Sequence, residues 1–257
     1  MNKPQLLMYA LSPKVTAFSS MRHGGYSQGN YGEFNVNLYC GDNAEAIAKN
    51  REALCQLLDI KPQRLLMPHQ THSDHVVEIG QDLLEMNEQE RAALLEGTDA
   101  LMTQVRGVCI GVSTADCIPV LLYDEAHHAA AAIHAGWRGT VKRIVKKTVE
   151  AMGERFGTSP EELMAVVGPG ISLEAFEVGD EVYEQFQDAG FPMAQIARRY
   201  AKWHIDLPSC NRLLLEETGV HRIEMSGICT YQQSGDYFSA RKQGVDSGRI
   251  LTGIVLR

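Results

Sequence analysis

The feature that most constrains the fold is a pair of short apolar runs in the middle of the chain. Residues 118–123 and 129–133 are almost entirely apolar, and the mostly polar segment 124–128 separates them. Apolar runs of this length around a short polar break are typical of buried strands joined by a tight turn. The sequence therefore predicts a buried β-hairpin.

The register of this hairpin determines whether two reactive side chains meet. If the turn is centred on Glu125 and Ala126, Cys117 lies directly opposite His134. Directly opposed residues hold their Cβ atoms about 4.5–5.5 Å apart, which would let a thiolate and an imidazole share a metal ion or a proton. A slip of one residue would place the two side chains on opposite faces of the sheet.

The segment after His134 is expected to change from strand to helix. Gly136 and Gly139 break the strand, and Thr140 can cap a helix whose apolar residues recur at helical spacing over 141–152. Arg138 stands at this predicted helix start, just beyond a strand end, where backbone N–H groups favour an anion. We therefore predict an anion site at Arg138.

The rest of the chain alternates strands and helices irregularly. Helical patterns span 47–58, 88–95, 179–187 and 207–217, and strand patterns span 15–18, 108–112, 165–167, 223–229 and 250–256. This order favours an α/β or α+β domain with mixed β-sheets flanked by helices. No linker or repeat divides the sequence, so we expect a single domain over residues 1–257.

Charge and cysteine usage restrict the partners and the compartment. The net charge of −8 argues against nucleic acid and acidic membranes as partners. The apolar run at residues 6–11 is too short for a signal peptide or a membrane span. Six cysteines are scattered without a Cys-x-x-Cys pair, which favours reduced thiols. We expect a cytoplasmic monomer.

A group of three histidines, His69, His72 and His75, recurs at intervals of three residues. This spacing cannot place all three on one face of a strand, and Pro68 argues against one continuous helix. At most one or two of them should therefore point into a common site. Glycine-rich nucleotide motifs and the Gly-x-Ser-x-Gly motif are absent from the sequence, so nucleotide-cofactor and serine-hydrolase functions lack support.

Three longer segments carry a resemblance to a known family. They read HQTH at 69–72, TADCIPVLL at 114–122 and IHAGWRG at 133–139, and they resemble the signature segments of the YfiH family. Shorter matches, such as SMRHGG at 20–25 and GPGI at 168–171, extend along nearly the whole chain. That family has been described as laccase-domain polyphenol oxidases and as purine nucleoside phosphorylases. The resemblance implies a YfiH-like fold and an enzyme.

The resemblance also implies a zinc centre. Position by position, the family's zinc ligands fall on His72, Cys117 and His134, which would also form the catalytic centre. His75 departs from the family, which often has an acidic residue there, and Ala240 stands where an aromatic residue is usual.

The chemistry of these side chains agrees with zinc. Two imidazoles and a thiolate suit Zn²⁺, and three protein ligands leave a fourth position open. An open zinc acidifies bound water or holds an anionic oxygen. Asp116 and Asp74 are candidates to accept hydrogen bonds from the ligand imidazoles. Cu²⁺ could occupy the same donors but is less favoured.

The function that the resemblance implies is phosphorolysis of purine nucleosides such as inosine, adenosine or methylthioadenosine, with adenosine deamination as a second activity. The partners would be a purine nucleoside and phosphate. In this interpretation Arg22 and Arg138 balance the phosphate charge. The loops around Asn37 and Gly168 would hold the nucleoside.

Two other enzyme functions compete with phosphorolysis. A metal-independent hydrolase would use Cys117 as nucleophile and His134 as base, which would fit the family's proposed role in removing faulty peptidoglycan precursors. A multicopper oxidase needs many paired histidines, usually as His-x-His. Nine histidines are present and none forms such a pair, so this function is the least favoured.

Overall fold

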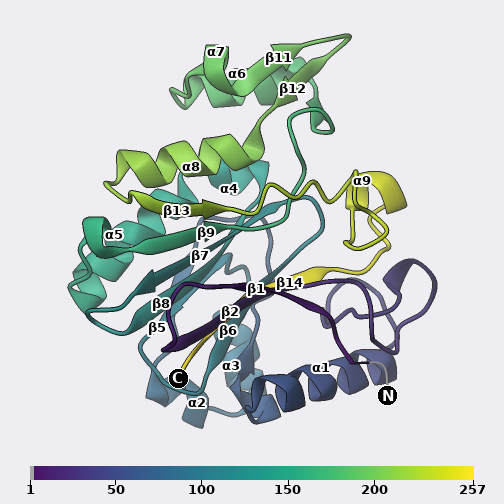
Figure 1. Ribbon diagram of the computed structural model, residues 1–257, viewed down its shortest axis with the longest axis vertical. Coiled ribbons are helices and arrows are strands. Elements are labelled where there is room, and N and C mark those ends of the chain that lie inside the picture. Colours follow the sequence, from purple (N-terminus) through teal and green to yellow (C-terminus); the bar gives the residue numbers. More distant parts are fainter. Residues whose placement is uncertain (1–2) are drawn as a thin grey trace.

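The computed structural model describes residues 3–257 and arranges them in stacked layers (Figure 1). One sheet holds β4 (Val76–Glu78), β5 (Ala100–Thr103), β7 (Ile118–Asp124), β8 (Ala129–Ala135), β9 (Met164–Val167) and β13 (Arg222–Met225). A second sheet holds β1 (Leu6–Tyr9), β2 (Val15–Ser20), β3 (Leu65–Leu66), β6 (Cys109–Thr114) and β14 (Ile250–Leu256). A small antiparallel sheet holds β10 (Glu177–Val178), β11 (Ala197–Arg199) and β12 (Trp203–Ile205).

Helices fill the outer layers. They are α1 (Ala44–Leu58), α2 (Gln81–Glu85), α3 (Glu88–Leu95), α4 (Trp137–Val141), α5 (Ile144–Phe156), α6 (Asp180–Asp188), α7 (Met193–Ile196), α8 (Leu207–Glu217) and α9 (Ala240–Gln243). Short 3₁₀ turns cover Gly29–Tyr31, Pro62–Arg64 and Pro160–Glu162.

The strand orders are β13-β9-β7-β8-β5-β4 and β1-β2-β14-β6-β3, and each of these two sheets mixes parallel and antiparallel pairs. The predicted class, with mixed sheets flanked by helices, is confirmed.

The alternation of side chains along β7 shows how the layers pack. Leu121 and Tyr123 point between the two large sheets, where they share a core with Ile110 of β6. Val120 and Leu122 point to the opposite face and pack in the core that α5 and α8 cover. Burying one such large apolar side chain contributes about 1.5–3 kcal/mol. Apolar residues of α1 cover the outer face of the other sheet, so the layers run helix, sheet, sheet, helix.

The predicted hairpin is confirmed as β7 and β8, in which every residue is buried. Its predicted register is wrong, because Pro119 rather than Cys117 pairs with His134. The turn covers 125–128, and the carboxylate of Asp124 accepts two backbone N–H bonds within it. The observed pairing differs from the predicted pairing by two residues. Because side chains alternate between the two faces of a strand, a shift of two residues leaves each side chain on its predicted face. Cys117 therefore still lies near His134, just before β7.

The helix predicted after the hairpin forms, but in two pieces. α4 begins at Trp137, and Arg143, with φ of 62°, separates it from α5. Thr140 is buried inside α4, and its hydroxyl shares hydrogen bonds with Asn211 of α8. The prediction that Thr140 caps the helix is therefore wrong, because the helix starts one turn earlier, after Gly136.

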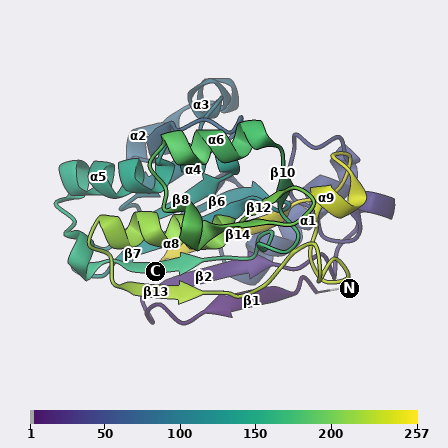
Figure 2. The same cartoon turned by 90° about the horizontal axis from the view of Figure 1, so that it is seen from above.

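Figure 1 and Figure 2 place α9 at one edge of the molecule and α5 at the opposite edge. The loops that precede β7 and contain α9 therefore gather at one end of the sheets, and this end holds the candidate site. No helix among residues 3–257 is long and apolar enough to cross a membrane.

Candidate metal centre

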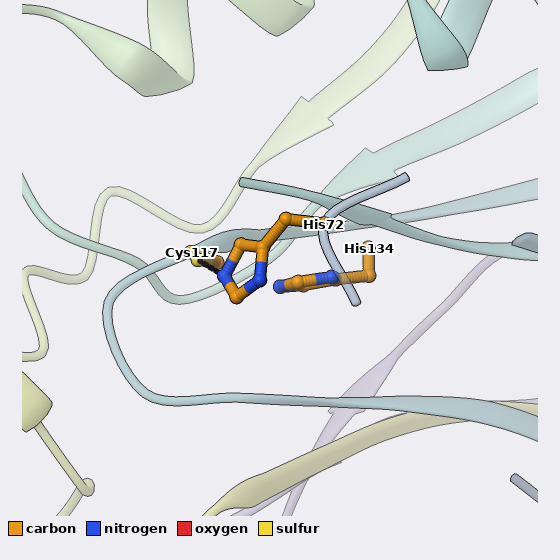
Figure 3. Close-up of side chains that lie close together, drawn as sticks. All are labelled: His72, Cys117 and His134. Carbon is orange, nitrogen blue, oxygen red and sulfur yellow. Dashed lines mark hydrogen bonds between the residues drawn. The ribbon is translucent and has the colours of Figure 1, made fainter. Parts of the chain in front are cut away.

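Three donor side chains from separate segments converge at this end (Figure 3). His72 comes from the loop between β3 and β4, Cys117 from the loop before β7, and His134 from β8 itself. Their ligand atoms all lie within 4.8 Å of one another, and Sγ of Cys117 is 3.7 Å from Nε2 of His72. The structure thus brings together the three residues that the sequence predicted. We call them the donor cluster.

Asp99 orients two members of the donor cluster. Its buried carboxylate accepts backbone N–H bonds from Thr71, His72 and Ser73, at 3.2, 3.2 and 2.7 Å. Nδ1 of His134 lies 2.6 Å from Oδ1 of the same carboxylate, which leaves Nε2 of His134 for a metal. His72 has φ of 60°, a left-handed conformation that these hydrogen bonds hold in place.

Asp116 holds the third member of the donor cluster. Its carboxylate accepts hydrogen bonds from the Thr230 hydroxyl and from the backbone N–H of Arg241, both at 2.7 Å. Asp116 has φ of 89°, so the chain turns sharply just before Cys117. Two segments far away in sequence therefore fix the loop that carries the thiol.

The two carboxylates predicted to accept from the ligand imidazoles, Asp116 and Asp74, have other partners in the structure. Asp116 accepts from Thr230 and Arg241, and Asp74 forms ion pairs with Lys142 and Lys147. Asp99 performs this role for His134, and sequence reasoning missed it. The sequence offered one indication of this role. Asp99 directly precedes a buried strand, where a charged side chain needs a partner because an unpaired buried charge is costly.

Gly136 allows two members of the donor cluster to lie close to the backbone. A Cβ atom at this position would lie 2.7 Å from Cδ2 of His72 and 3.1 Å from Sγ of Cys117. Its φ of −67° is ordinary, so the position requires space rather than unusual backbone freedom. Two imidazoles and a thiolate match the donor set of an open zinc site, which keeps a fourth position for water or substrate.

The charges within the donor cluster are strongly coupled. Burial raises the pKa of Cys117, but the imidazoles of His134 and His72 outweigh it and lower this pKa to about 6. Burial lowers the pKa of His134, but the Cys117 thiolate and Asp99 raise it to about 9. Without metal, the pair at neutral pH is therefore a thiolate beside an imidazolium. The thiolate is the form that binds metals and attacks electrophiles.

The donor cluster lines a cavity of about 340 Å³. The other lining residues are Asn37, Tyr39, Cys40, His69, Gln70, Ser113, Thr114, Ala115, Ala240, Val245 and Arg249. This volume lies at the lower end of the range for small-molecule sites. A larger hollow of about 540 Å³ lies against α1, but its lining contains no member of the donor cluster.

Of the four predicted substrate residues, Asn37 lines this cavity. Its Nδ2 donates a hydrogen bond of 2.5 Å to Oγ of Ser113. Gln70 bonds the backbone N–H and carbonyl of Ser113, so these three polar residues form one network. Gly168 lines a separate cavity of about 180 Å³.

The two predicted phosphate-binding arginines lie outside the lining. Arg22 donates to the backbone carbonyls of Gly32 and Ser234. Arg138 is exposed and lies over the Trp137 ring, 4.3 Å from its centroid. Among residues 3–257, Arg249 is the one arginine or lysine in the cavity lining.

A second group of possible metal ligands lies at the turn between β7 and β8. It consists of Asp124, His127 and Glu162. The carboxylate of Asp124 already has hydrogen-bond partners at this turn, because it accepts from the backbone N–H and the ring of His127. Across the described part of the chain, the two groups hold three histidines between them, fewer than a multicopper centre requires.

The fold and the site together define an α/β protein with a group of three side chains that could hold a metal ion. The family model described as "Multi-copper polyphenol oxidoreductase laccase" matches residues 16–257, and the chain belongs to this family. A solved structure titled "Crystal structure of Bacillus licheniformis hypothetical protein YfiH" matches with a TM-score of 0.90 and 25% identity, covering 100% of both chains. The predicted membership of the YfiH family is confirmed.

Two curated relatives connect the family with nucleosides. A protein of Bacteroides thetaiotaomicron named purine nucleoside phosphorylase is 47% identical over 247 residues, covering 94% of this chain and 92% of the relative. A protein from an unknown prokaryotic organism named adenosine deaminase RL5 is 41% identical over 245 residues and covers 93% of each chain.

Proposed function

We propose that this protein is a zinc-dependent purine nucleoside phosphorylase acting on nucleosides such as inosine, adenosine or methylthioadenosine. The observation that carries the proposal is the open donor cluster in a cavity large enough for a small ligand. The name of the 47% identical relative supports the reaction class. The relative named adenosine deaminase supports adenosine deamination as a second activity.

His72, Cys117 and His134 would hold the zinc ion. When bound, zinc supplies a Lewis acid that polarises a substrate oxygen. Asp99 keeps the proton of His134 on Nδ1, so Nε2 remains available as a ligand. A thiolate ligand needs a reducing compartment, and we therefore propose a cytoplasmic location.

Phosphorolysis breaks the bond between C1′ of the ribose and N9 of the purine, and forms a bond between C1′ and a phosphate oxygen. The electron pair of the broken bond stays on N9, and the proton that hydrogen phosphate loses ends on the purine. Arg249 brings a positive charge to the cavity lining, although its guanidinium already donates to the carbonyls of Val245, Ser247 and Gly248. Nδ2 of Asn37 has a second hydrogen to donate. The roles of Arg22, Arg138 and Gly168 in substrate binding stay predictions.

A second candidate function is supported by the spatial arrangement of Asp99, His134 and Cys117, in which His134 lies between the carboxylate and the thiol. A carboxylate that orients an imidazole beside a thiolate is the arrangement of cysteine hydrolases. The contact of Cys117 with His72, a second imidazole that this triad does not use, favours a metal centre over the triad.

The test is purine release from inosine, measured with and without phosphate. The proposal expects hypoxanthine and ribose 1-phosphate in equal amounts, and no release without phosphate. Release of free ribose without phosphate would identify a hydrolase instead. Ammonia release from adenosine, measured in parallel, tests the second activity.

A further inference from the structure

An aromatic pair in the cavity lining has no role in the functions above. Tyr39 stacks on His69, with ring centroids 4.1 Å apart and an interplanar angle of 22°. Both residues line the cavity, yet Tyr39 is 48% exposed. The imidazole therefore covers one face of the phenol ring, while much of the ring stays accessible to a ligand.

Hydrogen bonds hold both members of this stack. Nδ1 of His69 lies 2.8 Å from each carboxylate oxygen of Glu96, and the backbone N–H of His69 donates to the carbonyl of Leu95. The backbone N–H of Tyr39 donates to Oδ1 of Asn37 at 2.6 Å. A flat surface that is fixed in advance loses little conformational freedom when a ligand binds.

The apolar surface continues around the cavity. Val245, which also lines it, is 73% exposed, and Leu38, next to Tyr39 in the chain, is 56% exposed. Exposed apolar side chains beside a polar cavity indicate a ligand that has both an apolar and a polar part. A nucleoside has this division, with a flat base and a hydroxylated sugar.

We propose that the stack of Tyr39 on His69 is the platform for the purine base, with the ribose extending toward the donor cluster. This inference rests on the proposed function. Every base has a flat π-face, so stacking tolerates differences between hypoxanthine and adenine. A pyrimidine covers less of the platform than a purine, so the platform also favours purines over pyrimidines.

The test compares steady-state kinetics of inosine phosphorolysis by four proteins. Tyr39→Ala should raise the KM for inosine about 5- to 150-fold, which corresponds to about 1–3 kcal/mol of base stacking. The KM for phosphate and the zinc content should not change. Tyr39→Phe keeps the ring and should restore the low KM. Tyr26→Ala is the matched control, because Tyr26 is 41% exposed and lines the separate hollow against α1.

The outcomes distinguish a failure of the proposed platform from a failure of the proposed reaction. An active wild type with an unchanged inosine KM in Tyr39→Ala would overturn the platform and leave the proposed function standing. A KM increase shared equally by inosine and phosphate, or an increase that Tyr39→Phe does not reverse, would also overturn it. A wild type that releases no purine with phosphate would overturn the proposed function, and the platform with it. Tyr39→Leu, which keeps an apolar side chain, provides a second variant should Tyr39→Ala fold poorly.

Discussion

The replacement of Asp99 by asparagine tests how the donor cluster is held together. The carboxylate accepts hydrogen bonds from three backbone N–H groups and from the His134 ring. Asparagine keeps one acceptor oxygen and presents an NH₂ group at the other position. The donors are shared two and two between Oδ1 and Oδ2, so either orientation of the amide leaves two of them facing an NH₂ group.

The expected effect on stability is large. Each buried donor left without an acceptor costs about 1–3 kcal/mol, so Asp99→Asn should lower the free energy of unfolding by about 2–6 kcal/mol. One amide orientation removes the acceptor of the His134 ring, and the other releases the Thr71 and Ser73 N–H groups that hold the His72 loop. Changes to the partners of metal ligands weaken metal binding by about 10- to 100-fold. Zinc titration against a competing chelator and urea unfolding of the metal-free protein measure the two effects separately.

The matched control is Asp74→Asn. Asp74 is also acidic and close in sequence to His72, but its partners are the exposed side chains of Lys142 and Lys147. Surface ion pairs contribute about 0–1 kcal/mol, so this variant should keep its stability and zinc affinity. Equal zinc affinity in Asp99→Asn and the wild type would refute the role of Asp99, as would equal losses in the two variants.

Three further predictions concern the donor cluster. Gly136→Ala should abolish tight zinc binding, measured by mass spectrometry of the native protein, because the added Cβ would lie 2.7 Å from a His72 ring atom and displace that ring. A fully zinc-loaded variant would contradict this role of Gly136. His69→Ala and His75→Ala should each retain about one zinc per chain, since neither histidine belongs to the donor cluster. Metal loss in either variant would show that His72 is not the zinc ligand among the three histidines. In metal-free protein, alkylation of Cys117 should reach half its maximal rate near pH 6, because the thiolate forms as the pH rises through its lowered pKa. Zinc should slow this alkylation at Cys117 but leave Cys40 unaffected, and equal rates at Cys117 with and without zinc would contradict ligation.

Strong local patterns in the sequence were sufficient to predict several elements. The two buried strands of the hairpin and the helix at 207–217 were predicted because apolar spacing and turn residues agree there. The hairpin register was not predictable, because the side chain of Asp124 decides the length of the turn. β1 and β5 were missed because their residues, LLMY and ALMT, are mostly Leu, Met and Ala, which favour helices at least as much as strands.

The donor cluster was only partly predictable from its residues. The proximity of Cys117 and His134 followed from the hairpin, although the predicted pairing was wrong. The choice of His72 among three histidines came from the family resemblance. Its position depends on a left-handed turn held by Asp99, which lies 27 residues later in the chain. Such long-range hydrogen bonds leave no periodic signal in the sequence.

The most direct test of zinc-dependent phosphorolysis is reconstitution of the metal-free protein. Purine release from inosine with phosphate is measured while zinc is added in known amounts, with copper added in a parallel series. The account predicts that the metal-free protein is inactive and that activity rises linearly until about one zinc per chain, with copper restoring little. Full activity of the metal-free protein, or recovery with copper alone, would contradict it.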